Sequence, residues 1–252
     1  MKKLVPLIFA ALLLLSSCSA DFPNEVNSPD DLPGRVIGVL AGSSSIKFAR
    51  EIGSVMVYSD SAGLLNALRN GTVDCILMER AAADIFVSGV RRVQILAEPL
   101  IEYDMRFAVP KENVQLLSAV NSALAQLRQD GTLAGLRDKY FIGADFAHMP
   151  PEDAAQRPGY LRVAVPYNFA PYAFTDEYGQ IAGMSVDVAR AVAGILGVDL
   201  LIDAQDAEDL VTTVWFGRAD LAVGFVPQDG DAEFVNFSDS YARSVQVIIA
   251  RR

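Results

Sequence analysis

Histidine and cysteine are scarce in this chain of 252 residues, which contains one histidine and two cysteines. A metal site built on imidazole groups, or a catalytic triad with histidine as its base, therefore has little support. The two cysteines are Cys18, close to the amino terminus, and Cys75. We expect no disulfide between residues of the folded body, because Cys75 is its only cysteine. Cys75 lies in the apolar run Val73–Met78, which is typical of a buried strand, and we interpret it as a small core residue. We expect neither a metal ion nor a cofactor.

Basic residues are outnumbered as well: 21 lysines and arginines face 31 aspartates and glutamates, a net charge of −10. This charge argues against nucleic acid or an anionic lipid surface as a partner of the folded body. The chain is 52% hydrophobic and 21% charged, which is typical of a globular protein and excludes a disordered or collagen-like one.

The amino terminus has the features of an export signal. Lys2 and Lys3 precede the apolar run Leu4–Leu15, which is shorter than the roughly 20 residues that a membrane span needs. The following segment, Leu15–Cys18, resembles the bacterial lipobox, in which the cysteine is lipidated and becomes the new amino terminus. We therefore expect residues 1–17 to be a signal peptide and a lipid on Cys18 to anchor the protein in the bacterial cell envelope, facing the periplasm or the exterior. An ordinary secretory signal is the alternative.

Strands and helices alternate in two separate stretches, which predicts an α/β protein with largely parallel sheets. A polar tether (18–33) leads into an α/β unit (34–105), which is followed by two helices broken at Asp130–Thr132. The segment 143–159 is rich in proline and glycine, lacks periodicity and is interpreted as a linker. A second α/β unit follows it (160–252).

The two α/β units share a short pattern: a helix, a glycine, two residues, an aspartate and a strand. It comprises Gly71 and Asp74 in one unit and Gly217 and Asp220 in the other. Such a glycine ends a helix with a left-handed residue that turns the chain into the strand. We infer two similarly built lobes. Ligands of open α/β sheets bind at the carboxyl ends of the strands, so facing lobes would form one cleft.

Three sets of short segments stand out in the sequence. The first comprises Leu161–Val165, Pro171–Phe174, Gly183–Asp187, Gly217–Asp220 and Asn236–Tyr241; the second comprises Asp31–Val39 and Ala41–Ser44; the third comprises Gln126–Thr132 and Lys139–Phe141. Together they resemble the type II periplasmic solute-binding proteins, in the branch that binds polar amino acids for ABC transporters. The first set is similar to the family's amino-terminal portion, the second to its second lobe and the third to its carboxy-terminal helices.

In the family, the part that matches Leu161–Arg252 comes before the part that matches Asp31–Phe141. This chain has the two parts in the opposite order, so the resemblance implies a circularly permuted chain. Residues 160–252 would form lobe 1 ending in a hinge strand, and residues 34–105 would form lobe 2. Residues 106–142 would supply a hinge strand and helices that pack on lobe 1, and 143–159 would join the family's usual termini. We expect a two-lobed type II binding-protein fold with a central cleft, a single covalent crossing near Met105–Lys111, and Val245–Arg252 paired beside it.

The resemblance also implies a ligand site. The loop of Gly42, Ser43 and Ser44 would hold a ligand carboxylate at a helix amino terminus, although one serine could simply cap the helix. Glu79 would pair with the ligand amino group, and an exposed ion pair is the alternative.

An aromatic side chain would form the wall of the site. Phe169 matches the family's position best, and Tyr167 or Tyr172 could serve instead; packing in the core is the alternative for each of them.

One departure concerns the ligand carboxylate. Where the family supplies an arginine that binds this group, this chain has the acidic residues Asp229, Asp231 and Glu233. Unless Arg106 or Arg243 enters the cleft, we expect a ligand that is cationic or that is bound differently at this end.

The sequence thus predicts a lipid-anchored, monomeric solute-binding protein that captures a small polar ligand, amino-acid-like or cationic, for an ABC transporter permease. We expect no enzyme activity, because Glu79 or Asp231 would have to act as an acid or base without an identifiable partner. A sensor or interaction protein with an altered cleft, or a dehydratase-like enzyme on the same fold, remains an alternative.

Overall fold

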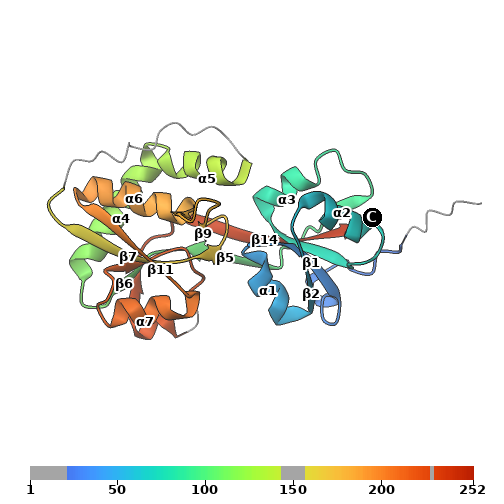
Figure 1. Ribbon diagram of the computed structural model, residues 1–252, viewed down its shortest axis with the longest axis horizontal. Helices are drawn as coiled ribbons and strands as arrows, with labels where there is room; N and C mark the ends of the chain where they lie inside the picture. The colour runs from blue at the N-terminus through green and yellow to red at the C-terminus, as the bar shows by residue number, and fades with distance from the viewer. Residues whose placement is uncertain (1–21, 143–156, 228–229) are drawn as a thin grey trace, which may run out of the picture.

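The computed structural model describes residues 22–142, 157–227 and 230–252. They form an elongated molecule of two lobes joined by long strands (Figure 1). The predicted signal peptide, the lipidation site Cys18 and most of the predicted linker lie outside these ranges. None of the helices in the described ranges is both long enough and apolar enough to span a bilayer.

Lobe 2 is built on a sheet with the strand order β2-β1-β3-β14-β4, and β5 also pairs with β14. Strands β1, β2 and β3 are parallel, whereas β14 is antiparallel to β3, β4 and β5. Its strands are β1 (Val36–Leu40), β2 (Ser54–Tyr58), β3 (Cys75–Glu79), β4 (Val93–Ile95), β5 (Ile101–Met105) and β14 (Ala242–Arg251), and its helices are α1 (Ser45–Ile52), α2 (Ser61–Arg69) and α3 (Arg80–Phe86). Every residue of β3 is buried, as its apolar sequence predicts.

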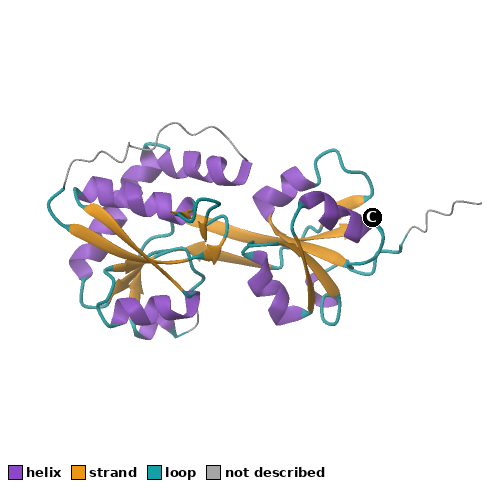
Figure 2. Cartoon of the chain, viewed as in Figure 1, coloured by secondary structure: helices purple, strands orange, loops and turns teal. Residues whose placement is uncertain are grey.

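Lobe 1 has a sheet with the order β11-β7-β12-β6-β13 and a small sheet, β10-β9-β8. Its strands are β6 (Ala108–Pro110), β7 (Tyr160–Pro166), β8 (Asn168–Phe169), β9 (Ala173–Thr175), β10 (Ile181–Ala182), β11 (Asp199–Gln205), β12 (Leu221–Ala222) and β13 (Val235–Phe237). The helices are α4 (Val114–Gln129), α5 (Thr132–Ile142), α6 (Met184–Leu196) and α7 (Leu210–Trp215), with 3-10 turns at η2 (Ala207–Asp209) and η3 (Asp231–Glu233). The 3-10 turn η1 (Pro29–Asp31) precedes β1 and belongs to lobe 2. Helices α5 and α6 lie on one side of the main sheet and α7 on the other (Figure 2). The predicted α/β class and two-lobed fold are confirmed.

The pattern shared by the two lobes has the same structural role in each. Gly71 and Gly217 adopt φ values of 74° and 69°, the left-handed conformation that lets the chain turn after a helix. The carboxylate of Asp74 accepts a hydrogen bond from the backbone N–H of Val36 at 2.8 Å, and Asp220 accepts one from Arg162 N–H, also at 2.8 Å. Each aspartate therefore fixes the turn to the start of the neighbouring parallel strand.

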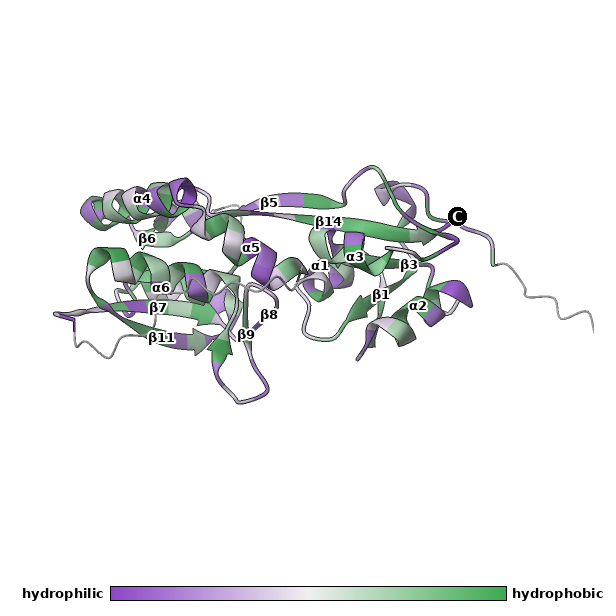
Figure 3. Ribbon diagram, turned by 90° about the horizontal axis from the view of Figure 1, so that it is seen from above, coloured by the Kyte–Doolittle hydropathy of each residue, from purple (hydrophilic) through white to green (hydrophobic). Residues whose placement is uncertain are grey.

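Two strand segments cross between the lobes, so the prediction of a single covalent crossing is wrong. The chain passes from β5 to β6 and later returns through β14 (Figure 3). Ala242, at the start of β14, pairs with Met105, and Arg251, near its end, pairs with Val93 in lobe 2. A strand of this length spans roughly 33 Å, enough to reach from one lobe across the other's sheet. The hinge is therefore a pair of antiparallel strands.

The tether predicted for residues 18–33 also differs from the structure, because its second half packs against lobe 2. Val26 is fully buried and Leu32 is 1% exposed, and both belong to the apolar cluster formed by β1, β3 and α1. The guanidinium of Arg251 donates to the carbonyl oxygen of Pro23 from two of its nitrogens, at 3.3 and 3.2 Å. Two isolated apolar residues in a polar stretch give no periodic signal, yet they cover the edge of this core.

Candidate functional site

A cavity of about 250 Å³ lies between the lobes, at the carboxyl ends of β1 and β3. No lysine or arginine of the described ranges lines it. Lobe 2 contributes Leu40, Ala41, Ser43, Ser44, Ser45, Leu77, Met78, Glu79 and Ala82, and the other lobe contributes Tyr140, Phe141, Ala170 and Pro171.

Glu79 is the only ionisable carboxylate that lines this cavity within the described part of the chain. It is 7% exposed and accepts hydrogen bonds from the Ser244 hydroxyl at 2.6 Å, the Val245 backbone N–H at 2.8 Å and the Gln246 amide at 2.8 Å. Burial raises the pKa of Glu79 to about 7, and these hydrogen bonds oppose the rise. No described lysine or arginine forms an ion pair with it, so the exposed ion pair considered from the sequence is not what the structure contains.

Gln246 connects Glu79 to the serines at the start of α1. Its amide nitrogen donates to the Ser44 hydroxyl at 3.2 Å, and its carbonyl oxygen accepts from the Ser45 hydroxyl at 2.6 Å. The sequence indicated Ser45 as the last residue of the serine loop, but it did not indicate Ser244 and Gln246. A usable signal exists for these two, because they are alternate polar residues in a strand whose next four residues are apolar, and both are fully buried.

The loop of Gly42, Ser43 and Ser44 contacts lobe 1 directly. The backbone N–H of Ser44 donates to the carbonyl of Ala170 at 2.9 Å, and the N–H of Ala170 donates to the carbonyl of Gly42 at 3.2 Å. The Ser43 hydroxyl donates to the Leu40 carbonyl at 2.8 Å. The Ser44 amide, which was expected to meet a ligand carboxylate, is therefore already bonded to the opposite lobe in this conformation.

The aromatic residues predicted at the site lie behind its wall. Phe169 stacks on Tyr172 with ring centroids 5.7 Å apart, and both are buried outside the cavity lining. The Tyr172 hydroxyl makes no hydrogen bond of good geometry among the described residues, but it is close enough to Glu79 to lower the pKa of that carboxyl. Tyr167 is exposed and donates to Asp206. Ligand contact by Phe169 or Tyr172 remains a prediction.

Tyr140 and Phe141 of α5 provide the aromatic surface that does line the cavity. Asp187 of α6 holds this end of α5 in place by accepting from the Tyr140 hydroxyl at 2.6 Å and from Lys139 Nζ at 2.8 Å. Phe141 packs edge-on against Tyr172 with centroids 5.5 Å apart. The helix end and the buried aromatic pair thus support one another.

The two arginines proposed as replacement anchors lie outside the cavity lining, Arg106 between β5 and β6 and Arg243 on β14. Arg106 donates to the Ser238 carbonyl and pairs with Asp104, each at 3.1 Å. Arg243 pairs with Glu102 at 2.7 Å. Asp231 belongs to η3 and does not line the cavity, while Asp229 lies outside the described residues. In this conformation, Ser43, Ser44 and Glu79 lie together at the cavity, whereas Arg106, Arg243 and Asp231 lie outside it.

Two α/β lobes, a hinge of paired strands and a cavity between the lobes define a two-lobed binding protein. The model of the bacterial extracellular solute-binding proteins, family 3, matches residues 46–143 and 161–252. The chain belongs to this family, in agreement with the resemblance seen in its sequence.

Individual relatives match smaller parts of the chain. The L-cystine-binding protein TcyJ of Escherichia coli (strain K12) is 34% identical over 124 residues, which are 48% of this chain and 46% of the relative. The arginine-binding protein ArgT of Corynebacterium glutamicum is 35% identical over 99 residues, 39% of this chain and 32% of its own. This chain therefore spans less than half the length of either relative.

Among solved structures, a phosphate-binding protein of a phosphate ABC transporter from Streptococcus pneumoniae TIGR4 superposes with a TM-score of 0.51. It covers 87% of this chain and 89% of its own length at 12% identity. At this identity the likeness supports the shared fold alone.

Proposed function

We propose that this protein is an extracytoplasmic solute-binding protein that captures a small polar ligand between its lobes and presents it to an ABC transporter permease. A lipid on Cys18 would hold the monomeric protein to the cell envelope. The observation that carries the proposal is the position of Glu79, a buried carboxylate that faces a cavity lined by both lobes and has no cationic partner among the described residues. Family membership supports the same role.

The hinge provides a physical route for capture. Both lobes line the cavity, so a ligand gains its full set of contacts only when the lobes are close together, and it thereby favours the closed state. Strands β5 and β14 pair along the crossing and can bend together, which is the usual hinge-type closure around a ligand.

The charges of the cavity favour a cationic ligand over a neutral α-amino acid. A free carboxylate is normally met by a guanidinium group or by free backbone amides. The cavity lacks a lysine or arginine from the described residues, and the Ser44 amide is bonded to Ala170. An ammonium group, in contrast, would be paired by the Glu79 carboxylate, which lowers the cost of burying both charges.

We also propose that the chain is a circular permutant of the family's usual order. Lobe 2 and its hinge strand come before lobe 1 in the chain, and α5 of the first part packs against α6 of the second through Asp187. A circular permutant must keep such contacts, because the segments pack together in the same way whichever of them comes first in the chain.

Calorimetry at pH 8 with a panel of amino acids and amines tests the ligand class. We expect binding of a cationic member and a loss of about tenfold to a hundredfold in affinity for Glu79→Gln, because hydrogen bonds to a charged group are lost. Glu102→Gln, at an exposed carboxylate outside the cavity, is the control and should bind normally. Tight binding of a neutral amino acid, unaffected by Glu79→Gln, would contradict the proposed class.

A sensor or interaction protein is a second candidate, favoured by the direct hydrogen bonds that Ala170 forms with Ser44 and Gly42. These bonds join the two lobes directly across the cleft, as a protein that works in its closed form would require. A panel that produces no thermal stabilisation would support this role, whereas formation of a product from a bound compound would support the dehydratase-like alternative.

A further inference from the structure

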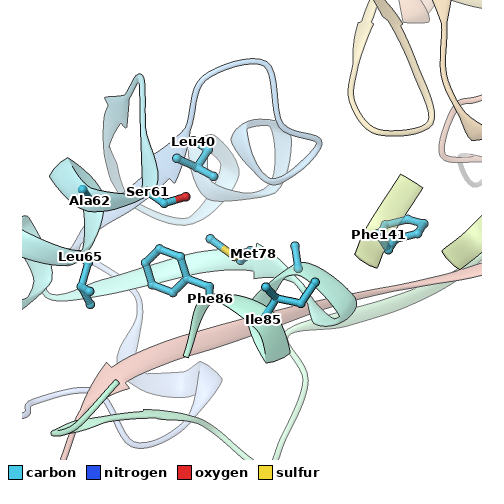
Figure 4. A pocket seen from close by; sticks show the side chains of 9 residues that line it. Leu40, Ser61, Ala62, Leu65, Met78, Ile85, Phe86 and Phe141 are labelled. Atoms are coloured by element: carbon cyan, nitrogen blue, oxygen red, sulfur yellow. The ribbon is translucent and has the colours of Figure 1, made fainter. Parts of the chain in front are cut away.

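A second and larger cavity, of about 420 Å³, adjoins the cleft on the lobe 2 side. It lies between α2 and α3, at the end of β1, and Phe141 of α5 faces it from the other lobe (Figure 4). We call it the apolar groove. Its lining consists of Leu40, Ser61, Ala62, Leu65, Met78, Ala82, Ile85, Phe86 and Phe141.

The groove and the cleft are immediate neighbours, because four residues line both of them. These residues are Leu40, Met78, Ala82 and Phe141. Met78 immediately precedes Glu79 in β3, so the groove begins beside the only carboxylate that lines the cleft in the described residues. A ligand with its charged group at Glu79 would therefore extend over Met78 into the groove.

The lining of the groove determines what kind of extension fits. Apart from the Ser61 hydroxyl, the lining side chains are hydrocarbon, aromatic or thioether groups. A second ammonium group or a carboxylate would lose its hydration there without gaining a partner. A hydrocarbon chain would instead be removed from water, which improves affinity by about fourfold for each buried methylene.

We propose that the groove is a subsite for the hydrocarbon chain of a primary monoamine, whose ammonium group lies at Glu79. The inference rests on the proposed function, because it takes the cleft to be a small-ligand site, and it adds the chemical class of that ligand. Three observations combine: a carboxylate that no described lysine or arginine pairs with, a cleft that none of them lines, and an apolar space that starts next to this carboxylate. The class excludes α-amino acids and diamines as preferred ligands.

Calorimetry on the purified protein at pH 8 tests the proposal with n-butylamine, n-hexylamine, hexanoate and 1,6-diaminohexane. We expect n-hexylamine to bind about fifteenfold more tightly than n-butylamine, since two more methylenes are buried. Hexanoate should not bind, and 1,6-diaminohexane should bind more weakly than n-hexylamine. Equal affinities for the two monoamines, or a preference for the diamine, would overturn the proposal.

Ile85→Asn tests the groove itself, because Ile85 is 51% exposed and its replacement should not disturb the core. The variant should reduce the preference for n-hexylamine over n-butylamine to about threefold or less. Val114→Asn is the matched control at a 62% exposed apolar residue of α4 outside the groove, and it should keep the full preference. An unchanged preference in Ile85→Asn would refute a role for the groove.

The same measurements separate this inference from the proposed function. If an L-amino acid binds in a Glu79-dependent manner and the alkylamines do not, the solute-binding function stands and the groove proposal fails. If neither the amines nor the amino acids bind, both fail.

Discussion

At the scale of a single residue, Glu79 is buried, and the three hydrogen bonds of good geometry that it accepts from described residues come from one strand. Ser244, Val245 and Gln246 of β14 donate to it. Burial raises its pKa from 4.5 to about 7, so both protonation states are accessible near neutral pH. A cation in the cleft would favour the ionised state, and ligand binding should therefore release a proton below pH 7.

This pKa predicts how the stability of the ligand-free protein depends on pH. The folded state binds the proton more tightly than the unfolded state does, so the contribution of Glu79 is complete below pH 4.5 and is lost as the pH rises to about 7. The loss is on the order of 3 kcal/mol, and it should be absent in Glu79→Gln.

Urea unfolding at several pH values between 4.5 and 8 measures this contribution. Glu102→Gln is the control, because its carboxylate is outside the cavity and paired with Arg243. A Glu79→Gln variant with the same pH profile as the unchanged protein would contradict the prediction.

At the scale of the elements, the segment before β1 acts as part of lobe 2. Leu32→Ala should destabilise the protein by about 2–5 kcal/mol, because it leaves a cavity in a core that the structure closes with this residue. Val114→Ala, at an exposed site, should change the free energy of unfolding by less than about 0.5 kcal/mol. Urea denaturation compares the two. A Leu32→Ala effect as small as that of the control would mean that residues 22–33 are not packed on the lobe.

The sequence was sufficient for the elements that carry a local pattern. The apolar run at Val73–Met78 became the buried strand β3, and the glycine and aspartate of each lobe form the predicted turns. Glu79 and the serine loop were found through the family resemblance, and the structure brings them to one cavity.

The remaining features depend on contacts between distant parts of the chain, which no local pattern contains. Gln246 meets Glu79 from 167 positions away, and Ala170 reaches the Ser44 amide from the other lobe. Phe141 enters the cavity because Asp187, on another helix, holds the end of α5. For the same reason, the double crossing of the hinge could not be predicted from the sequence of β14 alone.

At the scale of the whole molecule, the two ends of the described chain meet at lobe 2, where Arg251 donates to the Pro23 carbonyl. A rearranged chain that runs from residue 157 to 252, continues through a flexible linker of about eight residues and ends with residues 23–142 would have the family's usual order. The linker would span roughly 16 Å, ample for ends in contact. We expect cooperative unfolding with a Tm within about 5 °C of the original.

A second rearranged chain, joined in the same way but opened between Val163 and Ala164, provides the control. It interrupts β7, a buried strand that pairs with both β11 and β12, and we expect it not to fold. Circular dichroism during heating distinguishes the two chains. Failure of the first chain to unfold cooperatively would contradict a permuted origin.

The contact between Pro23 and Arg251 also bears on which lobe would move relative to the membrane. If the lipid on Cys18 fixes the protein to a membrane, only a few residues separate that anchor from a segment that is hydrogen-bonded to lobe 2. Lobe 2 then becomes the stationary platform, and lobe 1 swings on β5 and β14 when the cleft opens and closes. A permease specific for the closed form could then recognise it by the position of lobe 1 relative to the membrane surface.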